Sequence, residues 1–375
     1  MMINYGRKKP KFAKKKKFDG KKVLLIIAIV LLSLCLVAVA TYFTLDYFGK
    51  KNLENSQLPV MDMRGENDQS DYELVDAKTV RYKGKTYIFN ENIKNILFLG
   101  VDSTDDANKT GTRIRHQADV IVLCSIDEKS QKVRLINISR ETMADVQMFT
   151  ANGDYVGMQK QQIALSYSYL DGKEKSSQNT VQAVSDLFYG LPIHAYCTLM
   201  INAVQPINDA IGGVDVVVPI DMRNVNSRFV KGNKVHLQGN MVMQFLRSRS
   251  SLSDSTNDAR IERHKIYVKS FIPAAIKKTR KDILLPLELY NMLRDYIVTD
   301  ISPDKIVHLT KQALKLDIDD NMINLPGKSV KGEIFMEKHL DEKAFYELVL
   351  DNFYTVEAPA EPQEEITSNT QTKEK

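Results

Sequence analysis

Cysteine is scarce in this sequence, with three residues in a chain of 375. Cys35 lies within a long apolar run, whereas Cys124 and Cys197 lie in shorter apolar runs of the kind that form buried strands. Two buried thiols are favoured over a Cys124–Cys197 disulfide, although an oxidising exterior would permit that bond. No spacing of Cys and His residues resembles a zinc site, so nothing in the sequence supports a zinc protein.

Nucleotide-binding glycine motifs and internal repeats are also missing. The pair Gly212-Gly213 lies in neither a Walker nor a dinucleotide-binding pattern. It follows a short helical pattern, and glycine is common just after the last residue of a helix, so the pair is predicted to be a helix C-cap.

Net positive charge is confined to the start of the chain. Residues 1–22 hold ten Lys and Arg residues and one aspartate, a net charge of +9. The whole chain carries +5, and +5 less +9 leaves −4 for residues 23–375. A body with this balance is not expected to bind nucleic acid.

A long apolar run, residues 23–45, follows the basic tail and ends among aromatic residues such as Tyr42 and Phe43. Its length suits one bilayer crossing of roughly 20 residues, with the aromatics at the interface. Because positive charge is retained inside, we expect a single-pass protein of the cell membrane with a cytoplasmic N-terminus and an extracytoplasmic C-terminal domain. A cleaved signal peptide, with Ala38-Val39-Ala40 as the cleavage site, competes, but the run exceeds a signal core of roughly 7–15 residues.

The remainder predicts a stalk, one folded domain and a tail. Residues 46–80 are polar without periodicity, as expected of a stalk, and Lys83-Gly84-Lys85 is predicted to be the turn of a hairpin. Strand and helix patterns then alternate, which predicts an α/β fold, a single α/β/α sandwich domain with a mixed central sheet. We assign its catalytic core to 81–280, a helical and strand extension to 281–352, and a disordered tail to 353–375.

Three apolar runs in succession carry polar residues at one end. The first ends in Gly100-Val-Asp102, the second begins with Ala118-Asp119, and the third ends before Ser139-Arg140. If these strands are antiparallel neighbours in chain order, then Asp102, Asp119 and Arg140 meet at one edge of the sheet.

Further strands and helices follow from the apolar periodicity. Strands are predicted at 194–201, 214–219 and 322–325, and helices at 161–169, 177–189, 204–211, 240–246, 260–278, 284–298 and 303–314.

Four arginines lie between residues 245 and 265, namely Arg247, Arg249, Arg260 and Arg263. Arg260 and Arg263 share one helix face, and N-cap residues precede them, so Arg260 is near a helix N-terminus. Guanidinium groups beside free helix amides suit a doubly charged oxyanion such as a pyrophosphate. The competing interpretation is a solvated basic face paired with Glu262.

Aspartates and arginines at one sheet edge, in a domain held outside the membrane, suit a phosphate-rich ligand and a hard divalent cation. Mg²⁺ accepts one or two carboxylates together with substrate phosphates, and arginines neutralise charge on a phosphoryl group. Each aspartate alone could equally be a strand-end cap.

The order of these motifs resembles the LytR-CpsA-Psr family of cell-envelope proteins. The matching segments span about 170 residues, and each is weak by itself whereas the ordered set is specific. They are Asn95–Asp102, Ala118-Asp119-Val-Ile, Ile138-Ser-Arg140-Glu141-Thr142, Asn208–Asp215, Leu237-Gln-Gly239, Phe245-Leu-Arg247-Ser-Arg249 and Arg260-Ile-Glu-Arg263.

The resemblance implies an enzyme, a phosphotransferase that moves a glycopolymer such as teichoic acid from a polyprenyl-pyrophosphate carrier onto a peptidoglycan hydroxyl. By position it implies that Asp102 and Asp119 bind Mg²⁺. It also implies that five arginines contact the pyrophosphate or order the site: Arg140, Arg247, Arg249, Arg260 and Arg263. Apolar faces at 161–169 and 261–271 are candidates for the prenyl chain, with core packing as the competing interpretation.

Three departures from the family pattern indicate a divergent member. Gln117 stands where the family usually has Arg, although Arg115 could reach the same pyrophosphate from its loop. Glu141 replaces the usual Asp, and His264 replaces Gln. They leave a non-catalytic lipid- or polymer-binding envelope protein as an alternative. A transcription attenuator, the older family label, is a further alternative that the expected topology disfavours.

Overall fold

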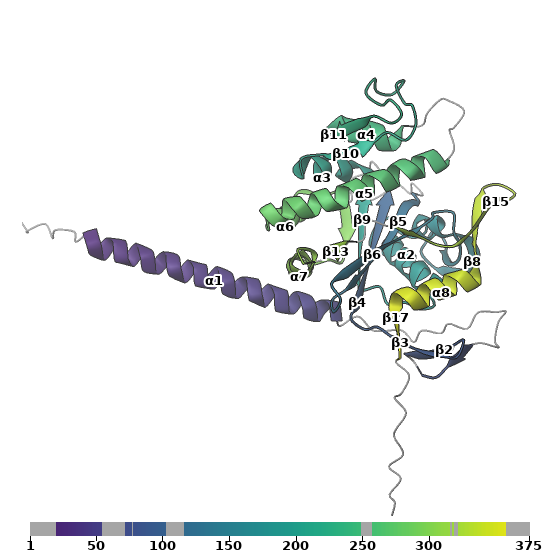
Figure 1. Cartoon of the computed structure of the whole chain (residues 1–375), viewed down its shortest axis with the longest axis horizontal. Coiled ribbons are helices and arrows are strands. Elements are labelled where there is room, and N and C mark those ends of the chain that lie inside the picture. The colour runs from purple at the N-terminus through teal and green to yellow at the C-terminus, as the bar shows by residue number, and fades with distance from the viewer. Residues whose placement is uncertain are drawn as a thin grey trace, which may run out of the picture.

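The protein is a mixed α/β domain built on a seven-stranded sheet (Figure 1). The computed structural model describes residues 20–54, 72–76, 78–102, 116–248, 257–315, 317–318 and 322–357. The strand order is β12-β9-β4-β5-β6-β13, and β14 also pairs with β6. These strands are β4 (Ile93–Val101), β5 (Ala118–Asp127), β6 (Lys132–Ile138), β9 (Ala195–Met200), β12 (Ile297–Thr299), β13 (Asp317–Ile318) and β14 (Ile323–Asn324).

The central strands have the predicted antiparallel order. β5 pairs antiparallel with both β4 and β6, whereas β9 pairs parallel with β4, so the sheet is mixed as expected. These strands are almost continuously apolar because helices cover both of their faces. The end of β4, the start of β5 and the end of β6 therefore share one edge, which is where the predicted site residues lie.

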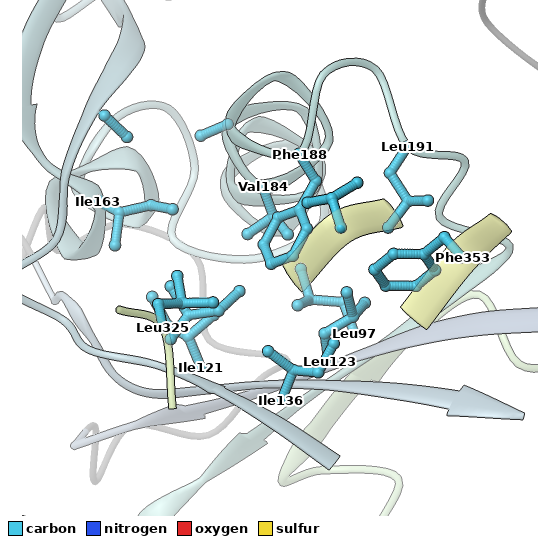
Figure 2. Close-up of a cluster of buried hydrophobic side chains, with 14 of the residues drawn as sticks. Leu97, Ile121, Leu123, Ile136, Ile163, Val184, Phe188, Leu191, Leu325 and Phe353 are labelled. Carbon is cyan, nitrogen blue, oxygen red and sulfur yellow. The ribbon is translucent and has the colours of Figure 1, made fainter. Parts of the chain in front are cut away.

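Helices α2 (Glu174–Leu187) and α8 (Glu342–Phe353) cover one face of the sheet. Figure 2 shows Leu97, Leu123 and Ile136 pointing from the strands toward Phe188 and Phe353, all of them buried. The other face carries Ile96, Val122 and Leu135 and packs against α1 (Gly20–Glu54), α5 (Asn257–Lys281) and α7 (Pro303–Ala313). Burying both faces stabilises the sheet by about 25 cal/mol per Å² of apolar surface removed from water.

A second, smaller apolar cluster lies on the outer side of α5, at the top of Figure 1. Phe229 and Phe245 meet edge to face at its centre, with ring centroids 5.7 Å apart, and Tyr267 joins them from α5. Because α5 contacts this cluster and the sheet, it fixes the arginines of its first turns relative to β5. Besides α5, the elements that contribute residues to this cluster are α3 (Val204–Ala210), β10 (Val214–Val217), β11 (Lys234–Leu237), α4 (Asn240–Arg247) and α6 (Leu285–Met292).

Besides the β10–β11 pair, the part of the chain that the structure describes has three more small β-structures next to the main sheet. β7 (Met143–Phe149) pairs with β8 (Tyr155–Gln162), and β15 (Gly327–Lys331) pairs with β16 (Met336–Leu340). A four-stranded sheet holds β1 (Tyr72–Leu74), β2 (Thr79–Tyr82), β3 (Lys85–Phe89) and β17 (Tyr354–Val356). The hairpin turn predicted between β2 and β3 is confirmed, with φ of 49° at Lys83 and 74° at Gly84, as a two-residue primed turn requires.

The last turns of α1 pack directly on the domain. Leu53 is fully buried, and the Asn52 amide donates to Asp304 at 2.7 Å. A side chain at Gly49 would meet the carbonyl of Asp304, so the two helices touch through their backbones there. Residues 46–54, predicted to begin a stalk, are therefore a docked helix. Among the residues that the structure describes, no helix has a stretch long and apolar enough to be identified as a membrane span.

Several sequence predictions need correction. Residues 161–169 form the end of β8 and a 3-10 helix, η1 (Ile163–Ser168), in place of an α-helix, and residues 284–298 divide into α6 and β12. The tail boundary at 353 is too early, because β17 pairs with β3, while residues 358–375 lie outside the described residues. Cys124 and Cys197 are free, as favoured, and burial raises the pKa of both thiols to about 12.

Candidate active site

Asp119 is the centre of the candidate site. Arg140 donates from Nη1 to Asp119 Oδ1, and Arg260 Nη2 lies 3.5 Å from the same oxygen. All three side chains are largely buried, with 15 to 18% of each exposed. The predicted meeting of Asp119 and Arg140 at one sheet edge is confirmed, and Arg260, far away in sequence, joins them there.

A β-bulge aims the Asp119 side chain. Gly100 pairs with Val120 and Val101 pairs with Ala118, so Asp119 is an extra residue in β5 with no partner in β4. Bulges leave one residue unpaired and redirect its side chain, and they are frequent beside active sites. A side chain at Gly100 would press on Val120, so glycine suits the close approach of the two strands there.

Gln117 takes part in the same network. Its Oε1 accepts a hydrogen bond from Arg140 Nη2, so Arg140 bridges Gln117 and Asp119. A guanidinium held through two of its nitrogens has a fixed orientation. The departure from the family pattern at 117 thus supplies an acceptor for Arg140 where an arginine would add another positive charge.

Asp102 forms a separate pair at this edge. Its Oδ1 lies 3.1 Å from Arg247 Nη2, with 41% of the Asp102 side chain and 45% of the Arg247 side chain exposed. Asp102 directly follows β4, and Arg247 is the last residue of α4. Water reaches both side chains, and exposed ion pairs contribute about 0–1 kcal/mol, so either side chain can leave this pair for another partner at little cost in free energy.

Arg263 is buried and faces backbone carbonyls. It is 2% exposed, its Nε donates to Phe245 O at 2.8 Å, and its Nη2 donates to Ser248 O. Burial, with the nearby charge of Arg260, lowers its pKa. It satisfies carbonyls at the end of α4, so of the two roles predicted for it the geometry favours ordering the site. Arg115 and Arg249 lie outside the described residues.

A pocket opens beside Asp119 and Arg140, and His264 and Lys265 of α5 line it together with Val268. His264 Nε2 lies 3.2 Å from Leu246 O, and since a carbonyl only accepts, this nitrogen carries the proton. Burial and the charge of Arg260 lower the His264 pKa to about 4, so its ring is neutral at pH 7.

One pocket residue was not found from the sequence. Lys265 lines the pocket two residues after Arg263, and a single lysine in an amphipathic helix gives no signal of that position. The 161–169 face offered for a prenyl chain is occupied by core packing, since Ile163, Ala164 and Tyr167 are buried. The other candidate for the prenyl chain is the apolar face of 261–271 on α5, and Val268 from this face lines the pocket.

The donor set at this edge fits a magnesium ion that depends on its substrate for ligands. Within the described ranges there is no group of three or more His, Cys, Asp or Glu residues that could hold a metal. Mg²⁺ does not need one, because it binds through one or two carboxylates, substrate phosphates and water. Asp102 and Asp119 provide two carboxylates at one sheet edge.

Fold and site together define a mixed α/β protein in which Arg140 and Arg260 hold Asp119 at one edge of the sheet, beside a pocket. The profile described as the LytR_cpsA_psr family matches residues 59–348. The chain belongs to this family, and the resemblance seen in the sequence is confirmed.

Curated relatives include two transferases. The polyisoprenyl-teichoic acid–peptidoglycan teichoic acid transferase TagU of Bacillus cereus is 24% identical over 239 residues, which cover 63% of this chain and 70% of that one. The protein of the same name from Enterococcus faecalis is 21% identical over 286 residues, covering 76% and 81%.

Solved structures share the fold at low sequence identity. Protein gbs0355 from Streptococcus agalactiae superposes with a TM-score of 0.55 at 16% identity, over 70% of this chain and 90% of that one. TagT bound to LIIa-WTA superposes with a TM-score of 0.51 at 13% identity, over the same shares of the two chains. The predicted mixed α/β fold with a mixed central sheet is thereby confirmed.

Proposed function

We propose that this protein is a membrane-anchored phosphotransferase that moves a glycopolymer from a polyprenyl-pyrophosphate carrier onto peptidoglycan. The observation that carries the proposal is the contact of Arg140 and Arg260 with Asp119 beside a pocket. Membership in the family supports it, as do the names of relatives that are teichoic acid transferases.

The arginines have the chemistry that such a reaction needs. An acceptor hydroxyl attacks the phosphorus that bears the polymer, and the bond from that phosphorus to the bridging oxygen of the diphosphate breaks. Polyprenyl phosphate leaves with the bridging oxygen, the hydroxyl proton passes to water or to the leaving phosphate, and a phosphodiester joins polymer and acceptor. Negative charge spreads over the phosphoryl oxygens, and fixed guanidinium groups stabilise it. Gln117 already orients the Arg140 side chain, so binding of the diphosphate costs this side chain little further conformational entropy.

Asp102 and Asp119 are the residues that would hold Mg²⁺. The ion would supply positive charge to the diphosphate oxygens. Asp119 contacts Arg140 and Arg260 and would thus keep both arginines close to an ion that it binds.

The anchor is residues 23–45, at the start of the continuous helix α1. The basic tail would remain in the cytoplasm and the domain would lie outside. This placement brings the pocket near a lipid-linked donor and its acceptor.

The test uses the full-length protein in detergent with a synthetic polyprenyl-pyrophosphate glycan, Mg²⁺ and peptidoglycan fragments. Arg140→Ala and Arg260→Ala are each expected to lower the transfer rate about 10²–10³-fold, as the loss of a charge-stabilising donor does. Arg223→Ala is the matched control, because Arg223 is exposed and pairs with Asp221. Equal rates for all three variants would reject the proposed site.

Gln117 and Glu141, which depart from the family pattern, motivate the non-catalytic alternative. It predicts that the wild-type protein binds the lipid donor without transferring its glycan. Tight binding with no detectable product would therefore favour a lipid- or polymer-binding envelope protein.

A further inference from the structure

The corner between α5 and α6, residues 277–284, combines positive charge with exposed apolar side chains. Ile283 is 48% exposed and Leu284 is 58% exposed, although they are neighbours in the turn. Across the described parts of the chain, none of the four cations that precede this turn forms an ion pair with a carboxylate. The cations are Lys277, Lys278, Arg280 and Lys281, and only Lys278 is half-buried.

The fold alone does not explain this combination. Cations favour the last turn of a helix because they complement its dipole, and single exposed apolar residues are normal on a protein surface. The dipole does not account for an apolar pair beside the cations, in a body whose net charge is negative. Asp282 lies within the corner, and the next acidic residue, Glu288, lies on α6. Cations beside exposed apolar side chains are typical of surfaces that lie on a membrane.

Helix α7 runs antiparallel to the end of α1. Asn52 contacts Asp304 in the first turn of α7. Asp46, six residues earlier in α1, contacts His308, four residues later in α7. The C-terminal end of α7 therefore points along α1 toward the proposed membrane span, residues 23–45.

The corner is joined to that end of α7. Arg280 Nη2 donates to Leu314 O at 3.4 Å. Leu314 lies six residues beyond His308, which is roughly 9 Å along a helix. The same rise along α1 leads from Asp46 into the last turns of the proposed span, so the corner lies beside the end of that span. Figure 1 agrees, because α6, α7 and the end of α5 lie on the side of the domain from which α1 extends.

We propose that residues 277–284 are a second membrane contact, which lies on the anionic headgroups of the bilayer that holds α1. The inference rests on the proposed anchor, because the span sets the height of the corner. Ile283 and Leu284 would enter the interface, where burial of apolar surface and attraction to anionic lipids both favour binding. A second point of attachment would limit the tilt of α1, so the pocket would keep one orientation to the bilayer.

The test uses tryptophan as the reporter, since the sequence contains none. Single-tryptophan variants of the full-length protein are placed in vesicles of phosphatidylcholine and phosphatidylglycerol with brominated acyl chains, which quench tryptophan on contact. Phe43→Trp reports on the proposed span and Leu284→Trp on the corner. Ile334→Trp is the matched control, because Ile334 is 80% exposed and belongs to the β15–β16 hairpin, on the side of the domain away from α1 (Figure 1).

We expect quenching of Phe43→Trp and Leu284→Trp and none of Ile334→Trp. Replacing the four cations by glutamine in Leu284→Trp should weaken the contact about fivefold for each charge, so most of the quenching should disappear. The same loss is expected when phosphatidylglycerol is omitted. Quenching of Leu284→Trp that depends on neither change would overturn the inference.

The remaining outcomes separate the contact from the anchor. Quenching of Phe43→Trp without quenching of Leu284→Trp would reject the contact and keep the anchor, whereas the reverse would reject the span and keep the contact. Quenching of neither would reject both. Equal quenching of Leu284→Trp and Ile334→Trp would mean that any exposed apolar residue enters the bilayer, and would overturn the inference.

Transfer is measured separately in detergent. Arg280 lies 20 residues along α5 from Arg260, which is roughly 30 Å of helix, so the four glutamines should leave the transfer rate unchanged. An inactive wild-type protein whose Leu284→Trp variant is quenched would reject the transferase and keep the contact. An active protein without that quenching would reject the contact and keep the transferase.

Discussion

Arg263 was expected to bind a charged ligand or to order the site, and in the structure it donates hydrogen bonds to backbone carbonyls. Its guanidinium spans the carbonyls of Phe245 and Ser248, on either side of the end of α4. The last carbonyls of a helix have no partner within it, and buried ones need a donor. Arg263 thereby holds α4, which carries Arg247, against α5, which carries Arg260.

Replacing Arg263 should therefore be costly to stability. Arg263→Ala leaves two carbonyls without donors and opens a cavity, and we expect unfolding free energy to fall by about 3 kcal/mol. Arg263→Lys, with a single nitrogen, should lie between. Urea unfolding followed by circular dichroism measures both, with the exposed Arg223→Ala as the control. A midpoint for Arg263→Ala equal to that of Arg223→Ala would show that these hydrogen bonds contribute nothing.

At the residue scale, the sequence predicted which side chains lie close together, but it did not predict the backbone geometry that orients them. Asp119, Arg140 and Arg260 could be brought together because each stands at the end of a clear apolar run or helix pattern. The bulge at Asp119 could not be predicted, since it depends on the pairing of Gly100 with Val120 across two strands.

At the element scale, the contact of α1 with α7 is a charged cluster. His308 is 2% exposed, its Nδ1 lies 2.9 Å from Asp46 and its Nε2 lies 3.1 Å from Glu128. Lys311 adds a second cation on Asp46. Burial alone would lower the His308 pKa, but the two carboxylates outweigh it and raise the pKa. The pKa values of Asp46 and Glu128 are lowered, since hydrogen bonds to the cations outweigh their burial.

These pKa shifts predict that the docking of α1 on α7 weakens both at high pH and at low pH. The raised His308 pKa contributes stability below about pH 6.5, which is lost as pH rises through the folded value. The lowered carboxylate pKa values contribute stability above about pH 4, which is lost on acidification. The positive charges of Lys50 and Lys94 also favour ionised Glu128.

Hydrogen exchange of residues 46–54 across pH, corrected for the intrinsic rate, measures the docking. Protection should be greatest between these limits and should fall on the alkaline side. His308→Gln should remove the alkaline fall, because it removes the titrating group. Protection that is flat with pH in the wild type would contradict this prediction.

The elements differ in how well their sequences predict them. β4, β5 and β6 were found because strands buried on both faces are continuously apolar, and α2, α3, α4, α5 and α7 because their apolar residues recur at helical spacing. The hairpin β7–β8 was missed, since its outer strand is mostly exposed and polar. The segment around Ile163 has helical spacing, yet its buried residues are held in a single 3-10 turn by the core.

At the scale of the whole molecule, α1 and the domain form one continuous body. Helix α1 runs from Gly20 to Glu54 without a break, and its end is fixed by Gly49, Leu53 and the cluster around His308. With the proposed span at residues 23–45, the docked segment 46–54 follows the span directly and is about nine residues, or roughly 14 Å of helix, long. The sequence alone predicted a polar stalk here, and a stalk made of flexible chain would have allowed a range of distances and directions.

A helical insertion should therefore change activity in proportion to the displacement it imposes. Seven residues, such as Glu-Ala-Ala-Ala-Lys-Ala-Ala, placed after residue 45 would raise the domain by about 10 Å with little rotation. Transfer from donors in vesicles should fall about tenfold or more, whereas transfer from donors in detergent should be unchanged. Equal activity in both settings would mean that the domain is not held at a set distance.

If residues 23–45 span the membrane as proposed, the docking of α1 also limits which acceptors the enzyme can serve. The pocket would then stay within a thin layer parallel to the bilayer, and diffusion of the protein in the membrane would extend that layer sideways only. Glycan strands that have moved outward from the membrane would be beyond its range. Attachment would then be restricted to wall material at the inner boundary, so the age of an acceptor strand would be selected by geometry, without any recognition of its chemistry.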